Sequence, residues 1–375
     1  MTHQTGPFAA LHEAFKEGRV SRREFVRAAT MLGVAAPVAL FVMNNTTQTA
    51  VHAQDATPAA SGANAPDSGT EGQTRGAGGE LKMLQWQGAT HFGLHTATGT
   101  KDQLAAGLVF EPLLNYLPDG TLIPCLAAEV PSVENGGLAE DLSSITYKLK
   151  EGVLWSDGTP FTAADVVFTW EWVVNPDNNA ITQLTYQTIQ SVEAIDDLTV
   201  KVTYPGTQLS WYVPFSGTYL GSIYPKHILE GADTDAYNAF ILAPIGTGPY
   251  VVSSFSANDQ VIYEANPNFR EPNKPFFQTV NLKGGGDAVS AAQAVLQTGD
   301  WHFAWNLQVE APILRDLVAN GIGTTQVSPP NSVERLLINF SDPNDESMGE
   351  RSHKDVPHPF FSDLKVRQAF ALATD

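Results

Sequence analysis

The sequence predicts an α/β fold, because strand-like and helix-like patterns alternate along most of its length. The most definite example lies in the second half of the chain. Residues 280–282 read as a strand, residues 284–286 are glycines, Asp287 is a good N-cap, and residues 288–297 follow a helical pattern up to the apolar residues 303–305. A strand, a helix and a strand in this order are typical of a βαβ unit with a right-handed crossover.

Further strands and helices are expected elsewhere along the chain. Residues 81–85 form a short apolar run after a glycine-rich leader, and we expect the first strand there. Residues 101–109 are expected to be helical. A β-hairpin is predicted over residues 192–204, and a second strand pair is predicted over residues 248–255 and 260–264.

One block of the chain combines a strand, a turn and a well-capped helix. Apolar and polar residues alternate over residues 145–150, which is the pattern of a half-buried strand. A turn is expected at residues 156–158, which read SDG, because Asp accepts local hydrogen bonds and Gly adopts positive φ. Thr162 then begins a helix, and Asp165 completes a capping box. An Asn-Pro pair ends the helix at residue 175.

This block also resembles a known family. Residues 149–172 read LKEGVLWSDGTPFTAADVVFTWEW, which is similar to a signature of the peptide/nickel-binding family of extracytoplasmic solute-binding proteins of ABC importers, the group that includes oligopeptide- and dipeptide-binding proteins. Five dispersed segments resemble the same family in the same order, and they read VFEPLLNYLPDGTLIPCLA (109–127), PIGTGPY (244–250), YEANPNF (263–269), QTGDWHFAW (297–305) and FSDLKVRQAFALATD (361–375). The order of the segments makes the resemblance specific.

The resemblance implies a bilobed fold, similar to type II periplasmic binding proteins, with an extra α+β domain inserted in the first lobe. Mapped on the motifs, lobe I comprises residues 80–112 and 244–328, and the inserted domain comprises residues 113–243. Residues 329–375 form the start of lobe II. The last residue, Asp375, lies inside an amphipathic helical pattern. Members of the family continue past this point, so the resemblance leads us to expect a C-terminally truncated chain with an incomplete second lobe.

The N-terminal residues 1–53 resemble a twin-arginine signal peptide. Ser21, Arg22, Arg23 and Phe25 form the motif, an apolar run follows, and a small-residue cleavage pattern ends the segment. The pattern predicts export of the folded protein by the twin-arginine machinery to the periplasm or the outer face of the cytoplasmic membrane. Cleavage and retention as an anchor both stay open. Residues 54–79 are rich in Ala, Gly, Ser and Thr, and we expect a disordered linker there.

The charge of the chain excludes some partners. After residues 1–53 are set aside, 16 basic and 37 acidic side chains remain, which gives a net charge of −21. Such a surface repels nucleic acid.

Cys125 is the single cysteine, so an intrachain disulfide is excluded.

The sequence shows no constellation typical of catalysis. His91 and His95 are four residues apart but lack the HExxH pattern, and the Gly-Gly-Gly-Asp run lacks the features of a phosphate loop. We therefore expect no catalytic residues, no metal ligands and no cofactor. The candidates for ligand contact, in a cleft lined by aromatic and a few polar groups, are Trp86, Glu111, Tyr219, Trp305 and Asn306. Core packing is the alternative for each Trp, and helix capping is the alternative for Glu111.

The leading functional hypothesis is a monomeric exported receptor that binds di- or oligopeptides between two lobes and delivers them to the permease subunits of an ABC importer. Within the same family, the ligand could instead be a nickel chelate, heme, a sugar or an opine. A hypothesis of another class is a secreted hydrolase of peptides or glycans. A structural surface protein without a ligand is a third reading.

Overall fold

The computed structural model describes residues 14, 19, 20, 70, 72–117, 119–284, 286–305, 308–327 and 336–374. The predicted signal motif of Ser21, Arg22, Arg23 and Phe25 lies outside these residues, and so does Asn306. The chain divides into two units, residues 1–323 and residues 324–375. Each unit is described by itself, and the assignment of residues 329–375 to a second lobe stays a prediction.

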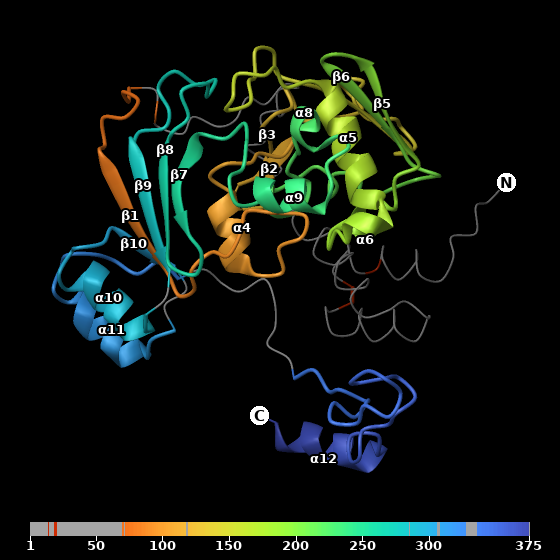
Figure 1. Ribbon diagram of the computed structural model, residues 1–375, viewed down its shortest axis with the longest axis vertical. Coiled ribbons are helices and arrows are strands. Elements are labelled where there is room, and N and C mark those ends of the chain that lie inside the picture. Colours follow the sequence, from red (N-terminus) through yellow and green to blue (C-terminus); the bar gives the residue numbers. More distant parts are fainter. Residues whose placement is uncertain are drawn as a thin grey trace. The chain divides into compact units, whose positions relative to one another are not determined.

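A five-stranded mixed sheet forms one side of the first unit (Figure 1). Its order is β10-β1-β9-β8-β7. Strand β1 pairs in parallel with both β9 and β10, while β7, β8 and β9 are antiparallel neighbours. The strand bounds are β1 Glu80–Gln85, β7 Tyr250–Ser256, β8 Gln260–Ala265, β9 Thr279–Gly284 and β10 Phe303–Trp305.

The predicted βαβ unit is present as β9, helix α10 (Ala288–Leu296) and β10. Asp287 is its N-cap, as predicted, because Ser290 N donates to Asp287 Oδ1 at 2.8 Å. The two strands of the unit are separated by β1, which pairs with both. Helix α11 (Ala311–Val318) packs against α10 around a small core of Ala292, Leu296 and Leu317 (Figure 1).

A second, three-stranded antiparallel sheet forms the other side of the first unit, in the order β4-β6-β5. Its strands are β4 Ser144–Lys148, β5 Ser191–Asp196 and β6 Thr199–Thr203. Helix α5 (Ala163–Val174) packs on β5 and β6 (Figure 1). The predicted cap is present, because Thr162 N donates to Asp165 Oδ2 at 2.9 Å. The predicted strand, hairpin and helix are all confirmed.

The remaining elements are short, and several of them lie between the two sheets (Figure 1). Of these elements, the sequence pattern predicted only the helix at residues 101–109. The observed helix is shorter and ends at Ala106. The bounds are α4 Thr100–Ala106, β2 Leu114–Tyr116, β3 Leu122–Pro124, the 3-10 helix η1 Pro176–Asn178, α6 Gln183–Tyr186, α7 Thr218–Gly221, α8 Lys226–Leu229 and α9 Thr234–Phe240.

The two sheets of the first unit share one hydrophobic core. The same cluster contains Tyr263 and Val280 of the five-stranded sheet and Ile145 and Val200 of the three-stranded sheet. Apolar packing therefore continues across the predicted boundary between lobe I and the inserted domain, and the division into those two domains stays a prediction.

His95 is the central polar residue of this shared core. Its Nε2 lies 2.8 Å from the carbonyl oxygen of Ser222, and its Nδ1 lies 2.8 Å from Thr182 Oγ1. A carbonyl only accepts, so Nε2 carries the proton and Nδ1 accepts from the hydroxyl. Burial lowers the pKa of His95 from 6.5 to about 4. Both ring nitrogens are engaged, which argues against a metal site shared with His91.

The predicted disorder of residues 54–79 does not extend to the end of that segment. Residues 72–79, which we call the strap, pair with residues 275–279. Gly76 N donates to Pro275 O at 3.0 Å, Gly78 N donates to Phe276 O at 2.9 Å, and the Arg75 guanidinium donates to the Asn266 carbonyl. The prediction is wrong for the strap because backbone groups, which composition does not reveal, tie it to the fold. Residues 54–69 and 71 lie outside the described residues.

The second unit contains helix α12 (Leu364–Ala373), which confirms a helix near the end of the chain. Asp363 caps it, since Lys365 N donates to Asp363 Oδ1 at 2.8 Å. Arg367 lies over the Phe340 ring, with 4.8 Å between its Cζ and the ring centroid.

Of the helices in the described part of the chain, none combines the length and the apolar character needed to cross a membrane.

The buried His95 should make stability depend on pH. The imidazole is neutral in the folded protein and titrates at about 6.5 when unfolded, so the unfolded state binds more protons between pH 6.5 and pH 4. The contribution of His95 to the free energy of unfolding is therefore fully present above pH 6.5 and decreases as the pH is lowered. We expect His95 to account for a loss of about 2 kcal/mol between pH 7 and pH 5.

Urea unfolding at the two pH values measures this loss. The variant His95→Gln should lose less stability between pH 7 and pH 5 than the native protein does. His302→Gln is the control for replacing a histidine by glutamine, because His302 is exposed and accepts a hydrogen bond from Lys82 N at 3.0 Å. An unchanged pH dependence in His95→Gln would contradict the argument.

Candidate functional site

The ends of three parallel strands meet at one edge of the five-stranded sheet. In the strand register, Gln85 at the end of β1 lies opposite Trp305 at the end of β10 and opposite Gly284 at the end of β9. Trp86 follows Gln85 directly. We call this the carboxyl edge. Sheets of this kind bind ligands outside the carboxyl ends of their strands, so the structure brings two of the predicted residues, Trp86 and Trp305, to such a position.

Gln85 and Trp86 differ sharply in exposure. Gln85 is 6% exposed, and its Oε1 has no hydrogen-bond partner, whereas Trp86 is 47% exposed. A buried polar atom without a partner costs about 1–3 kcal/mol. A half-turn of the amide would put Nε2 in that place, so the position can accept or donate. The pair therefore combines a buried polar group that lacks a partner with an open aromatic face.

Close backbone packing fixes the loop that carries Trp86. Asn258 N donates to Ala89 O at 2.7 Å, and Gly284 N donates to Asp259 O at 2.7 Å. A Cβ atom on Gly284 would lie 2.0 Å from the Cα of Gly88, so neither position tolerates a larger residue without a shift of the backbone. The loop after β1 is thereby held against the start of β8 and the end of β9.

Glu111 has a partner inside the protein. Arg270 Nη1 donates to Glu111 Oε2 at 2.6 Å, and Nη2 donates to Oε1 at 2.8 Å. Burial acts to lower the pKa of Arg270, but the hydrogen bonds and charge of Glu111 outweigh it and raise that pKa. Cys125 Sγ also donates to Glu111 Oε1, at 3.5 Å. Burial, followed by the charge of Glu111, raises the pKa of the Cys125 thiol, which keeps it protonated.

This geometry places Glu111 in an ion pair with Arg270, and the predicted ligand contact of Glu111 stays a prediction. The two partners are separated by 159 residues in sequence, and no local pattern links them. Sequence reasoning therefore missed Arg270.

Tyr219 lies in helix α7, which contacts helix α4, and its side chain is 45% exposed. The segments around Tyr219 and Glu111 pair with each other, through bridges between Pro112 and Ser222 and between Leu114 and Ser216. The predicted site residues thus fall into two groups. Trp86 and Trp305 belong to the carboxyl edge, and Glu111 and Tyr219 belong to these paired segments.

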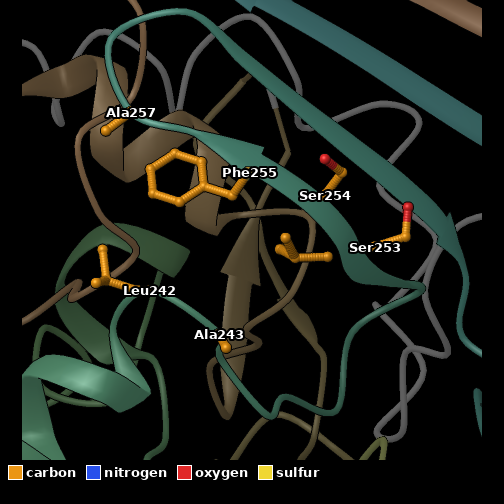
Figure 2. A pocket seen from close by; sticks show the side chains of 7 residues that line it. Leu242, Ala243, Ser253, Ser254, Phe255 and Ala257 are labelled. Atoms are coloured by element: carbon orange, nitrogen blue, oxygen red, sulfur yellow. The ribbon is translucent and has the colours of Figure 1, made fainter.

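A hollow of about 480 Å³ lies beside β7, the strand at the end of the sheet (Figure 2). Apolar side chains and two serines line it, and sequence reasoning identified none of them: Leu242, Ala243, Val252, Ser253, Ser254, Phe255 and Ala257. Figure 2 shows strand β7 along one side and the loop of Leu242 and Ala243 along the other. The lining has no charged group, so it offers little to orient a ligand.

Within the described residues, no group of three or more His, Cys, Asp or Glu side chains is placed to hold a metal ion. The chemistry available at the carboxyl edge is therefore hydrogen bonding by an amide and contact with indole rings.

Comparison with known proteins gives a family and several relatives. The model of the bacterial extracellular solute-binding proteins, family 5, middle region, matches residues 121–375, which is more than half of the chain. The oligopeptide-binding protein AppA of Bacillus subtilis (strain 168) is 30% identical over 248 residues, which cover 64% of this chain and 40% of AppA.

Solved structures show the same mixed α/β fold. AppA in complex with a nonapeptide matches with a TM-score of 0.53 at 26% identity, over 62% of this chain and 44% of that one. Haemophilus influenzae OppA in complex with RPPGFSPFR matches with a TM-score of 0.57 at 20% identity, over 67% and 50%. NikZ of Campylobacter jejuni in complex with Ni(L-His) matches with a TM-score of 0.50 at 27% identity, over 59% and 42%. The chain spans half or less of the length of these relatives.

The Glu111–Arg270 ion pair should behave as a buried structural pair. Arg270→Met leaves the Glu111 carboxylate buried without a cationic partner, and we expect it to lower the free energy of unfolding by about 3–5 kcal/mol in denaturant titrations. The double variant Glu111→Leu/Arg270→Met removes both charges and should recover much of the loss. Lys226→Met, which breaks an exposed pair with Glu230, is the control and should change stability by under about 1 kcal/mol. A similarly small loss in Arg270→Met would show that the pair is unimportant.

Proposed function

Because the chain belongs to family 5 of the bacterial extracellular solute-binding proteins, we propose that it is part of an exported receptor that binds di- or oligopeptides for an ABC importer. The family consists of solute-binding proteins of ABC importers, not of enzymes, which confirms the prediction that the chain is not an enzyme. The family also implies a location outside the cytoplasm. The secreted hydrolase and the ligand-free surface protein therefore have no support.

The arrangement at the carboxyl edge carries this proposal. A peptide presents N–H and C=O groups at regular intervals, and either group can satisfy the buried amide of Gln85. The exposed Trp86 ring beside it can cover an apolar or cationic side chain of the same peptide. Peptides are bound by AppA and OppA, two of the relatives described above.

The remaining parts of the proposal concern the whole receptor. Residues 80–112 and 244–328 would form lobe I, residues 113–243 an inserted domain, and residues 329–375 the start of lobe II. A peptide bound between the lobes would close them by a hinge motion, and the closed form would dock on the permease. The twin-arginine leader of residues 1–53 would bring the protein, already folded, to its site of action.

A nickel chelate is the second candidate ligand, and the similarity to NikZ in complex with Ni(L-His) favours it. A thermal shift measured with nickel and histidine together, against nickel alone and histidine alone, separates this case from peptide binding. Heme, sugars and opines are further ligands to be tested in the same assay.

The proposed site predicts that Trp86 contributes to affinity. In calorimetric titrations of the full protein with the tightest peptide of a tri- to nonapeptide library, Trp86→Ala should weaken binding about tenfold or more, which corresponds to about 1.4 kcal/mol. Gln85→Leu should also weaken binding, because it removes the group that pairs with the peptide. Small-angle scattering should show that the full protein becomes more compact when the peptide is added.

Phe276→Ala is the control, since Phe276 is an exposed aromatic residue, 37% against 47% for Trp86, that lies beside the strap and not at the carboxyl edge. It should leave the dissociation constant unchanged. Equal affinity of the native protein and Trp86→Ala would show that the peptide binds elsewhere. A full protein that binds no peptide and stays equally extended would contradict the proposed function itself.

A further inference from the structure

The chain contains two Asn-Gly pairs outside the candidate site, Asn135–Gly136 and Asn320–Gly321. Asparagine is among the residue types that are least stable to chemical change in proteins. When glycine follows it, no Cβ atom hinders the approach of the next backbone nitrogen to the side-chain amide carbon. Each pair can therefore deamidate unless the fold prevents it, and the two pairs differ in what the fold does.

Hydrogen bonds hold both polar atoms of the half-buried Asn135 side chain. Ser132 N and Gly137 N each donate to Asn135 Oδ1 at 2.9 Å, and Asn135 Nδ2 donates to the carbonyl oxygen of Val130 at 3.0 Å. The Asn135 backbone nitrogen also donates to Ser132 Oγ, at 3.2 Å. The amide carbon turns toward the Gly136 nitrogen only after the side-chain bonds break, so we expect the fold to protect Asn135.

The Asn320 side chain has no such support. Asn320 lies two residues after the end of helix α11 and is exposed. Within the part of the chain that the structure describes, its side chain makes no hydrogen bond. A Cβ atom on Gly321 would have no neighbour within 4 Å, so the space around the pair is open. The amide of Asn320 is therefore free to turn toward the next backbone nitrogen.

The backbone of the two pairs is held in much the same way. Gly321 N donates to Val318 O at 3.0 Å, and Gly136 N donates to Val133 O at 3.2 Å. Both glycines have positive φ, 75° and 72°. Each glycine nitrogen must leave its carbonyl partner before it can react, and a helix end such as that of α11 frays readily. The side-chain bonds therefore make the main difference between the pairs.

We propose that Asn320 is a site of spontaneous deamidation and that the fold protects Asn135 from the same reaction. The Gly321 backbone nitrogen forms a bond to the Asn320 amide carbon, the bond from that carbon to the amide nitrogen breaks, and ammonia leaves with the proton of the Gly321 nitrogen. Water then opens the succinimide ring at either carbonyl, which gives aspartate or isoaspartate with a new carboxylate. The site does not depend on the proposed function.

The new carboxylate should weaken the end of helix α11. A negative charge near a helix C-terminus opposes the helix dipole. Isoaspartate also adds a carbon to the main chain beside Gly321, which disturbs the turn that closes the helix. Leu317, three residues before Asn320, packs with Ala292 and Leu296 of α10 in the small core described above. We therefore expect deamidation to loosen α11 on α10.

Peptide mapping by mass spectrometry tests this proposal on the full protein, incubated for days in mildly alkaline buffer. We expect Asn135 to convert at least about tenfold more slowly than Asn320, which corresponds to a barrier higher by about 1.4 kcal/mol. One or two hydrogen bonds to the Asn135 side chain suffice for such a difference. In the chain unfolded by urea, both pairs should convert at similar rates, because only the fold distinguishes them.

Asn320→Gln is the control variant, because its longer side chain would have to close a larger and less favourable ring. Amide hydrogen exchange in residues 311–318 should become faster during the incubation of the native protein but not of the variant. Unchanged exchange in the converted native protein would contradict the weakening of α11. Equal conversion of the two pairs in the folded protein, faster conversion of Asn135, or a rate difference that persists in urea would overturn the proposal.

Discussion

Strand β1 is held on both sides by parallel partners, and this pairing determines where everything else in the five-stranded sheet lies. β9 and β10 reach the sheet only from late in the chain, yet both align with β1 in a register that ends at Gln85. The register puts Trp86 and Trp305 at one edge and fixes the loop after β1 against Gly284. Without that alignment, the two indoles that sequence reasoning singled out would have no common location.

Buried polar contacts, rather than apolar packing alone, specify how the rest of the first unit is joined. His95 links three segments far apart in sequence through Thr182 and Ser222. Glu111 and Arg270 do the same across 159 residues. Apolar side chains tolerate several arrangements, whereas a buried charge or imidazole tolerates only the one that satisfies it. These contacts therefore contribute specificity even where their net contribution to stability is small.

The sequence could predict what depends on neighbouring residues. The cap of α5 by Thr162 and Asp165, the β5–β6 hairpin and the β9–α10–β10 unit are all confirmed because local spacing dictates them. The sequence could not predict which distant strands pair with each other, and it could not predict that β1 lies between β9 and β10 in the sheet. The same limit applies to the site, where Trp86 could be placed but the burial of Gln85 and the partner of Glu111 could not. The family resemblance added the match to the fold of AppA and OppA, over 62% and 67% of this chain, which no local pattern carries.

The strap at residues 72–79 determines which bonds of the first unit would bear a force applied from the N-terminal side. It ends where β1 begins, at Glu80, whereas the carboxyl edge lies at the other end of that strand, about 20 Å away for a six-residue strand. A pull on the chain from its N-terminal side would first load the bonds of Gly76, Gly78 and Arg75 to residues 266–276. The force would then be spread over several bonds at once before it reached β1. A protein held by its N-terminal end would therefore keep its carboxyl edge unloaded.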